Sequence, residues 1–263
     1  GWVFNTNCNP AHATTEEEWG SLDDYPQYYG WGVDSGENHR AKRFFEMMEE
    51  PESEKITYER MKEIKFDYEL PECNNFQNSI ENLFKAKFED HPELAPLIHA
   101  INSWDRVAHK GSVGAAAYLI TFQKMWKTLG YGDGAFKGTV SIADSVYLES
   151  LIWAKQQIDK HYNGVLPSLG EVQRHVRAEV DLPLSGFPDV LAANYNQDHI
   201  NGRYKPHVAD SYVHFAQWPK DGGPVKIETL HPFGASSRPG SPHYTDQMQM
   251  YANQETKTMT LDR

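Results

Sequence analysis

Three asparagines, Asn5, Asn7 and Asn9, stand within the opening string GWVFNTNCNP. A side-chain amide is a neutral N–H donor, and fixed donors of this kind stabilise the oxyanion that forms during acyl transfer. Asparagine is also a common turn residue, because its side chain bonds to nearby backbone. On these residues alone the turn interpretation is favoured, so a catalytic interpretation needs support from elsewhere in the chain.

The sequence contains none of the common short catalytic or cofactor-binding patterns. It has no GxxxxGK[ST] loop, no strand-linked GxGxxG, no GxSxG elbow, no HExxH and no CxxC. A zinc site is therefore not expected among its twelve histidines. Two acidic runs could bind calcium, although such runs more often form a solvated face. These runs are Glu16, Glu17 and Glu18, and Asp23 and Asp24.

Composition excludes several classes of protein. The 263 residues can form one large domain or two ordinary ones, and 13% aromatic residues argue against disorder. The net charge of −12 opposes binding to nucleic acid or to an anionic membrane. No apolar run is long enough to span a bilayer, and no leader peptide is present in these residues. Cys8 and Cys73 are compatible with one disulfide or with two free thiols.

Helical patterns dominate the first two thirds of the chain. After a loop over residues 11–36, Ala41, Phe44, Phe45 and Met48 share one helix face, and Thr57 is a suitable N-cap for a second helix. Further apolar stripes continue to about residue 165. They comprise Phe76, Ile80, Leu83 and Phe84, the run SVGAAAYLITFQKMWKTLG, and the set Ala143, Tyr147, Leu151, Ala154 and Ile158.

The remainder of the chain has a different character. Residues 181–206 are rich in turn formers, whereas SYVHFAQW and VKIETL alternate as strands do. We therefore expect the strands mainly after residue 205. The sequence predicts an α+β protein with a loop segment over 1–36, helices over 37–165 and an irregular, β-rich tail over 166–263.

The most specific string is GASSRPGSPHYTDQMQMY, from Gly234 to Tyr251. It resembles the C-terminal signature of the penicillin acylase family of N-terminal-nucleophile hydrolases, a Gly-x-Ser-rich turn followed by Ser-Pro-His-Tyr-x-Asp-Gln and an aromatic residue. The matching residues here are Ser241, Pro242, His243, Tyr244, Asp246, Gln247 and Tyr251.

Other stretches agree in the order that the family has them. GWVFNTNCNP is similar to the family's Gly-aromatic-aliphatic-x-Asn-x-Asn-x-x-Pro, and HRAKRFFEMM is similar to its Arg-x-x-Arg helix. EVDLPLSGFPDVLAANYN resembles the segment before the family's returning strands, and ADSYVHFAQW resembles the strand that follows. Together the matches reach from Gly1 to about Tyr251, which makes a chance resemblance less plausible than for any single motif.

The resemblance implies an αββα sandwich with an inserted helical knob domain. Residues 1–36 would hold the active-site asparagine segment, 37–165 the knob, and 166–263 the returning strands and C-terminal turn. Family members are exported precursors that cut themselves into α and β chains, and the β chain begins with Ser, Cys or Thr. Gly1 is none of these. We therefore expect this chain to be the C-terminal half of a β chain, inactive alone, periplasmic or secreted, and partnered by the α chain and the rest of the β chain.

The implied chemistry is hydrolysis of an N-acyl amide through an acyl-enzyme. By position Asn7 would be the oxyanion-hole donor, and Arg40 would orient the site. No cofactor is required, but a structural calcium is possible, with Asp23, Asp24 and Asp34 as candidate ligands. The resemblance assigns a structural role to the C-terminal motif, in which the expected anchors are Ser241, His243, Tyr244, Asp246 and Gln247.

The sequence leaves the substrate open among β-lactam side chains, acyl-homoserine lactones and acyl lipopeptides. It also leaves two other functions open. The chain could be a non-catalytic helical interaction or binding module with short motif matches, or a family member that has lost activity and serves as a binding scaffold. The residues upstream of Asn7 would separate these readings, since an acylase needs a small residue followed by Ser, Cys or Thr there.

Overall fold

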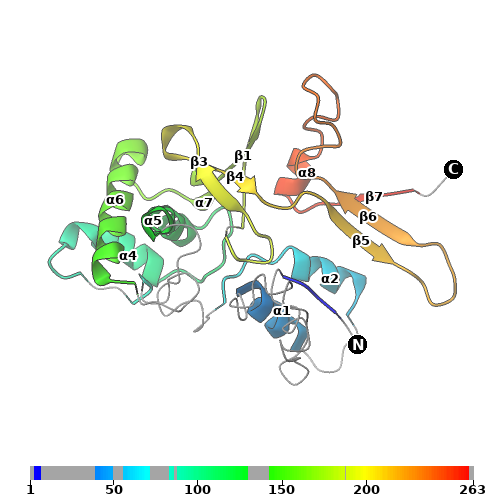
Figure 1. Ribbon diagram of the computed structural model, residues 1–263, viewed down its shortest axis with the longest axis horizontal. Helices are drawn as coiled ribbons and strands as arrows, with labels where there is room; N and C mark the ends of the chain where they lie inside the picture. Colours follow the sequence, from blue (N-terminus) through cyan, green and yellow to red (C-terminus); the bar gives the residue numbers. More distant parts are fainter. Residues whose placement is uncertain are drawn as a thin grey trace, which may run out of the picture.

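The computed structural model describes residues 3–6, 39–49, 56–71, 83–85, 88–129, 142–186 and 188–260. Over these ranges the chain has a block of helices followed by short antiparallel strands, so its fold class is α+β as predicted (Figure 1). No helix in these ranges is long and apolar enough to cross a membrane.

The opening segment lies against the first helix. In residues 3–6 the ring of Phe4 stacks on Phe44 of α1 (His39–Glu49) at 4.4 Å between centroids and meets Phe45 edge-on at 5.0 Å. Helix α2 (Tyr58–Lys65) follows, and Thr57 caps it by accepting a hydrogen bond from the backbone N–H of Arg60 at 3.0 Å. The N-cap predicted at Thr57 is therefore confirmed.

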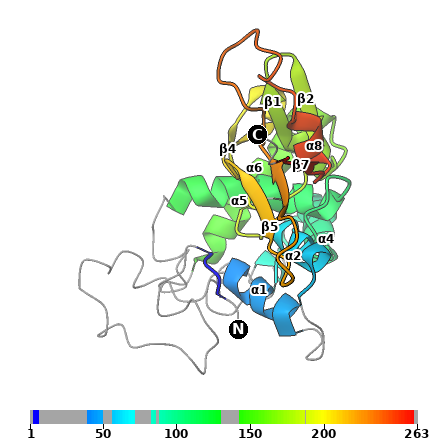
Figure 2. The same ribbon diagram turned by 90° about the vertical axis from the view of Figure 1, so that its right-hand side faces the viewer.

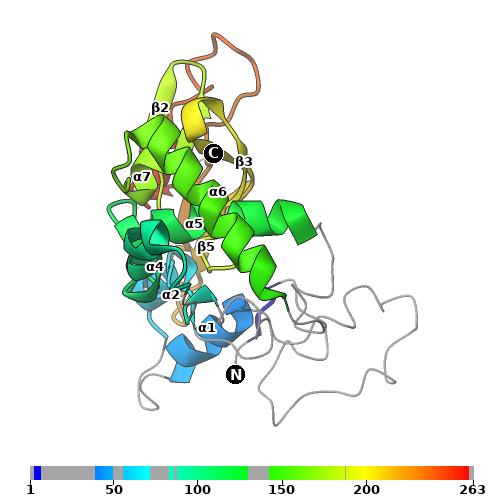
Figure 3. The ribbon, with the colours of Figure 1, turned by 90° about the vertical axis from the view of Figure 1, so that its left-hand side faces the viewer.

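A central helix organises the helical block. In chain order, the elements of this block are η5 (Pro92–Leu94), α4 (Ala95–Asn102), α5 (Val113–Leu129), α6 (Asp144–Tyr162) and α7 (Leu169–Val172). Helix α5 is buried over most of its length, and α6 crosses it on one side while α4 packs on another (Figure 3). The stripe predicted for α6 is buried at Tyr147, Leu151, Ala154 and Ile158, and α6 ends at Asn163, whose φ of 53° is left-handed.

The strands form three small antiparallel sheets. The first pairs β1 (Arg174–Arg177) with β2 (Val180–Pro183), and the second pairs β3 (Tyr195–Asp198) with β4 (Tyr204–Val208), with η6 (Ile200–Gly202) between them. The third joins β5 (Val213–Gln217), β6 (Lys226–Leu230) and β7 (Lys257–Thr258), with α8 (Met248–Ala252) before the last strand. Figure 2 shows β5 and β7 in front of the helices.

The prediction that strands lie mainly after residue 205 is wrong. Strands β1, β2 and β3 come earlier, and β4 begins at Tyr204. Among the turn formers of this region, Asn201 lies in the turn between β3 and β4 and adopts a φ of 56°. Each strand has only four or five residues and carries polar side chains, so alternation of apolar residues gives no signal.

Two hydrophobic clusters hold these parts together. The larger one contains apolar residues of α4, α5 and α6 and also Leu169, Val172, Val190 and Tyr204 from beyond residue 165. The smaller one packs α2 and α8 against the third sheet, with Tyr58, Val213, Phe215, Leu230 and Tyr251 among its members. The division of the chain at residue 165 stays a prediction.

A charged contact also joins α2 to the third sheet. Lys62 Nζ donates to Glu228 Oε2 at 2.6 Å, and the hydroxyl of Thr256 donates to the same oxygen. Burial alone would raise the pKa of Glu228, but the hydrogen bonds from Lys62 and Thr256 outweigh it and hold that pKa at about 2. The carboxylate thus stabilises the folded protein in its charged form.

We expect acid to remove this stabilisation. The pKa of Glu228 is lowered from its ordinary value of 4.5, so its contribution is complete above that pH and is lost as the pH falls toward 2. Glu228→Gln should lower the free energy of unfolding by about 1–3 kcal/mol at pH 7. In urea titrations the deficit should shrink between pH 4.5 and 3, while Glu179→Gln, at an exposed position, serves as the control. A deficit that is constant with pH would contradict this.

The contact between α4 and α5 requires a glycine. A Cβ at Gly114 would lie 2.5 Å from Trp104 Cβ and 2.7 Å from the carbonyl oxygen of Ala100. Gly114→Ala should therefore destabilise the protein by about 1–3 kcal/mol, despite the higher helix propensity of alanine. Gly223→Ala, whose nearest neighbour is the side-chain oxygen of Asp221, should change stability by less than about 0.5 kcal/mol in the same urea titration.

Candidate active site

The first turn of α1 presents two side chains to one carboxylate. Arg40 Nε lies 3.3 Å from Asp189 Oδ1, and His39 Nδ1 lies 2.7 Å from Asp189 Oδ2. The backbone N–H of His39 also donates to Oδ2 at 3.3 Å. A carboxylate at this place interacts favourably with the positive end of the helix dipole. Asp189 therefore fixes both the start of α1 and the orientation of Arg40, across 149 residues of sequence.

Asp189 occupies an unusual backbone conformation. It lies between β2 and β3 and has a φ of 64°, in the left-handed region that few residues other than glycine, asparagine and aspartate adopt. Tyr195, the first residue of β3, interacts electrostatically with the same carboxylate. Burial and, to a smaller extent, the charge of Asp189 raise the pKa of Tyr195, Arg40 opposes the rise, and the result is a pKa of about 12. Tyr195 is thus a neutral phenol at physiological pH.

The second arginine of α1 has its own partners. Arg43 donates to both carboxylate oxygens of Asp67, at 3.0 and 3.1 Å, and its Nη2 lies 2.8 Å from Glu69. A two-pronged guanidinium–carboxylate pair is geometrically specific as well as strong. Arg43 therefore ties α1 to the segment after α2, and the pair of arginines predicted from the Arg-x-x-Arg pattern anchors the helix at two separate places.

Several residues named in the predictions above lie outside the described part of the chain. They are the oxyanion candidate Asn7, the calcium candidates Asp23, Asp24 and Asp34, and the cysteines Cys8 and Cys73. The adjoining residues 3–6 do lie on α1, where Thr6 is 8% exposed. Within the described ranges, no group of three or more His, Cys, Asp or Glu side chains could hold a metal ion. The calcium site stays a prediction.

The C-terminal motif forms a turn that is bonded to itself. The hydroxyl of Ser241 accepts from the backbone N–H of His243 at 3.2 Å, and His243 Nδ1 lies 2.9 Å from Asp246 Oδ2. Gly234 sits directly beneath this pair, because a Cβ there would lie 2.3 Å from the carbonyl oxygen of His243. The motif residues therefore belong to one compact loop.

Two further motif residues connect this loop to the strands. The side-chain oxygen of Gln247 accepts a hydrogen bond from the backbone N–H of His231 at 3.0 Å. The backbone N–H of Gln247 donates to the carbonyl oxygen of Phe233 at 3.0 Å. The guanidinium of Arg177, on β1, lies 3.9 Å from the ring centre of Tyr244. The structural role assigned to the motif stays a prediction. The loop and α8 lie well away from α1 in Figures 1 and 2, so the structure does not bring the motif to Arg40.

Sequence reasoning missed three residues of the cluster around Arg40. His39 is next to the predicted residue Arg40, whereas Asp189 and Tyr195 are distant from Arg40 in sequence. Asp189 follows Pro188 in the stretch EVDLPLSGFPDVLAANYN, which resembles the family segment before the returning strands. A single sequence contains no signal for pairing across so many residues, so only the fold could identify Asp189 as the partner.

A family model described as penicillin amidase matches residues 1–263. Among solved structures, a thermostable penicillin G acylase from Alcaligenes faecalis is similar at 14% identity and a TM-score of 0.44, over 97% of this chain and 55% of that chain. This chain thus spans about half the length of that acylase chain. Comparison with curated proteins gave no match.

Replacing the shared carboxylate should loosen α1. Asp189→Asn keeps the shape and tolerates the left-handed backbone, but it removes the charge that faces His39 and Arg40. We expect amide hydrogen exchange in α1 to become about tenfold faster or more, corresponding to a loss of 1–2 kcal/mol of local stability. Asp198→Asn, which removes an exposed partner of Lys127, should leave exchange in α1 unchanged. Equal protection of α1 in both variants would contradict this role.

Proposed function

Because this chain belongs to the penicillin amidase family, we propose that it forms part of an acylase that hydrolyses an N-acyl amide. One observation in the structure supports the proposal beyond the family match. The opening segment stacks on the same helix that carries Arg40, through the contact of Phe4 with Phe44. The two stretches that the family pattern associates with the active site therefore lie side by side, although residues 7–38 separate them in sequence.

In the proposed reaction a hydroxyl or thiol attacks the amide carbonyl, the amine leaves, and water then releases the acid from the acyl-enzyme. The family pattern places this nucleophile at an N-terminal Ser, Cys or Thr, with its own α-amine as the base. We propose that the nucleophile is supplied by a part of the protein outside these 263 residues, because the family pattern places it well upstream of the Asn-x-Asn motif. The α chain and the remainder of the β chain would then be the partners.

This chain would contribute to the stabilisation of charge. Each tetrahedral intermediate carries an oxyanion, which requires donors whose positions are fixed before the reaction. We propose Asn7 as such a donor. Arg40 would orient Asn7. Its guanidinium is fixed by the contact with Asp189, and residues 3–6, which precede Asn7, pack on the helix that carries Arg40.

Other features of the intact protein follow from the family pattern and are proposals here. The three small sheets would join larger sheets of an αββα sandwich, and the helices around α5 would form the knob. The protein would be processed autocatalytically and would work in the periplasm or outside the cell. A structural calcium would be held by Asp23, Asp24 or Asp34. β-Lactam side chains, acyl-homoserine lactones and acyl lipopeptides all remain candidate substrates.

The decisive experiment removes the proposed oxyanion donor. In the intact, processed enzyme, Asn7→Ala should lower kcat by about 10²–10³ while the folded state is retained, because one fixed donor to the transition state is lost. Turnover of a chromogenic N-acyl amide measures the effect, and thermal unfolding reports on the fold. Processed protein is needed, since self-cleavage passes through a similar oxyanion.

Asn5→Ala and Asn9→Ala are the matched controls, because the family pattern assigns the oxyanion donor to the second asparagine of its Asn-x-Asn pair, which is Asn7. If one of these variants lost activity and Asn7→Ala did not, the register of the motif would be wrong. If all three variants retained full activity, the opening segment would be only a turn. An intact protein without any turnover would favour a binding module or an inactive scaffold instead.

A further inference from the structure

Arg177, the last residue of β1, differs from the other half-buried arginines in the described part of the chain. Its guanidinium has no hydrogen-bond acceptor and no carboxylate partner among the residues that the structure describes. The others each donate to a carboxylate or a carbonyl oxygen, and they are Arg40, Arg43, Arg60, Arg106, Arg174 and Arg203. The chain has 37 acidic and only 25 basic side chains, so acceptors are plentiful. The N–H donors of Arg177 are therefore available to a ligand.

Aromatic rings hold this side chain in place. The guanidinium carbon of Arg177 lies 3.9 Å from the ring centre of Tyr244 and 4.7 Å from that of Phe233. Such contacts with ring faces stabilise a cation, and they leave the N–H groups in the plane of the guanidinium free to form hydrogen bonds. Both rings belong to the segment 233–246, which contains most of the C-terminal motif. The donors of Arg177 are thus positioned before any ligand binds.

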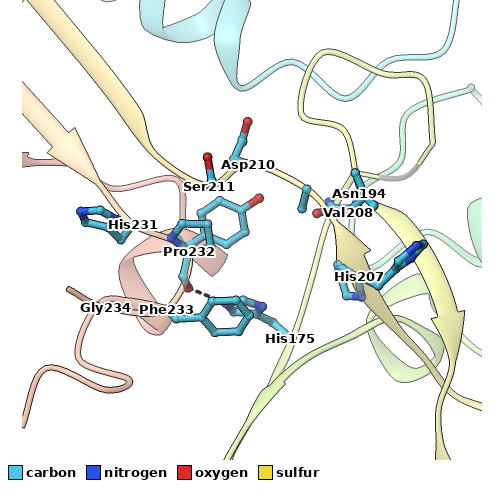
Figure 4. Close-up of a pocket in the computed structure, with 13 residues that line it drawn as sticks. His175, Asn194, His207, Val208, Asp210, Ser211, His231, Pro232, Phe233 and Gly234 are labelled. Atoms are coloured by element: carbon cyan, nitrogen blue, oxygen red, sulfur yellow. Dashed lines mark hydrogen bonds between the residues drawn. The ribbon is translucent and has the colours of Figure 1, made fainter. Parts of the chain in front are cut away.

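His175 fixes the strand beneath Arg177. It lies two residues earlier on β1, so its side chain points to the same side of the strand. Its ring stacks on Phe233 at 4.7 Å, and its Nε2 lies 2.5 Å from the carbonyl oxygen of Pro232 (Figure 4). Burial lowers the pKa of His175, and the positive charge of Arg177 lowers it as well. The ring is therefore neutral and adds no second positive charge beside Arg177.

A second donor belongs to one of the two rings. The hydroxyl of Tyr244 has no hydrogen-bond partner within the described ranges, and this residue is half-buried. The carboxylate of the motif, Asp246, is already engaged by His243 Nδ1 at 2.9 Å. Figures 1 and 3 show the β1–β2 hairpin and the segment before α8 projecting from the same end of the molecule. A ligand or a partner can therefore approach Arg177 and Tyr244 together.

We propose that Arg177 and Tyr244 bind a carboxylate, carried by a small organic acid or by an acidic side chain of a partner protein. Two parallel N–H groups of the guanidinium match the two oxygens of a carboxylate, and the hydroxyl of Tyr244 would donate a third hydrogen bond. A singly charged group fits best, because Arg177 supplies one positive charge and the net charge of −12 opposes a further negative one. The structural role predicted for Tyr244 concerns its ring, whereas this role concerns its hydroxyl. The site does not depend on the proposed function, since this loop lies well away from α1.

Acetate and acetamide test the need for a negative charge, because they have nearly the same shape. In ¹H–¹⁵N NMR titrations of the purified protein at pH 7 and constant ionic strength, acetate should shift the Nε–H resonance of Arg177 with a Kd of about 10–50 mM. Acetamide should bind about tenfold more weakly or worse, and inorganic phosphate should bind no more tightly than acetate.

A pair of peptides identifies the source of the carboxylate. The tripeptide acetyl-Ala-Glu-Ala-amide presents a carboxylate on a protein backbone, and acetyl-Ala-Gln-Ala-amide is its neutral counterpart. If the source is a partner protein, the Glu peptide should bind about tenfold more tightly than acetate, because its backbone makes further contacts. If the source is a small acid, the Glu peptide and acetate should bind equally. The Gln peptide should not bind in either case.

Three variants test the location, with binding followed through the backbone amides of residues 176–178 and 241–246. Arg177→Lys keeps the charge but loses the two-pronged donor, so acetate binding should weaken about fivefold or more. Tyr244→Phe keeps the ring beneath the guanidinium and should weaken binding about 3–10-fold, because one neutral hydrogen bond is lost. Arg60→Lys, on α2, is the matched control and should bind acetate as the parent does.

The NMR spectrum of each variant reports whether it is folded. Absence of acetate binding at Arg177, equal affinity for acetate and acetamide, tighter binding of phosphate, or undiminished binding by folded Arg177→Lys would overturn the proposal. Undiminished binding by folded Tyr244→Phe would remove Tyr244 from the site.

Discussion

The burial of α5 is the constraint on which the rest of this structure depends. Ten residues of the helix are buried, from Ala115 to Met125, including three consecutive alanines and several large side chains. A helix that is apolar on all sides has to be covered on all sides. Helices α4 and α6 cover it by direct packing, and aromatic rings extend the contact, since Tyr118 lies 5.3 Å from both Phe84 and Trp104. The positions of the flanking elements follow from this coverage.

The link from α5 to the strands is made by backbone hydrogen bonds. The N–H of Leu169 donates to Ser112 at 2.9 Å and that of Gly170 donates to Lys110 at 2.6 Å, which fixes α7 beside the start of α5. Strand β1 begins two residues after α7, so the central helix also sets where the first hairpin starts. The segment with Asp189 follows that hairpin, and α1 is held by it. The geometry at Arg40 is therefore connected to the core through a short sequence of elements.

A helix, cap or strand could be predicted from the sequence when it depends on residues that are close together in the chain. The α6 stripe, the Thr57 cap and the alternation in β5 and β6 were predicted, because a helix face, a cap and a half-buried strand each depend on nearby residues. The earlier strands were missed because polar residues are buried in them. Asn196 of β3, for example, donates to Gln173 at 2.6 Å, and both side chains are buried. Such residues read as loop in sequence and are satisfied only by the tertiary fold.

Asp189 is subject to two requirements that few amino acids meet together. Its φ of 64° admits glycine, asparagine and aspartate with little strain and disfavours longer or β-branched side chains. Its contacts with His39 and Arg40 call for a negative charge. Glycine and asparagine satisfy the backbone but not the charge, whereas glutamate supplies the charge on a side chain that the backbone disfavours. Of the twenty residues, aspartate meets both requirements with the least strain, so a substitution at this loop position costs either the backbone conformation or the charge.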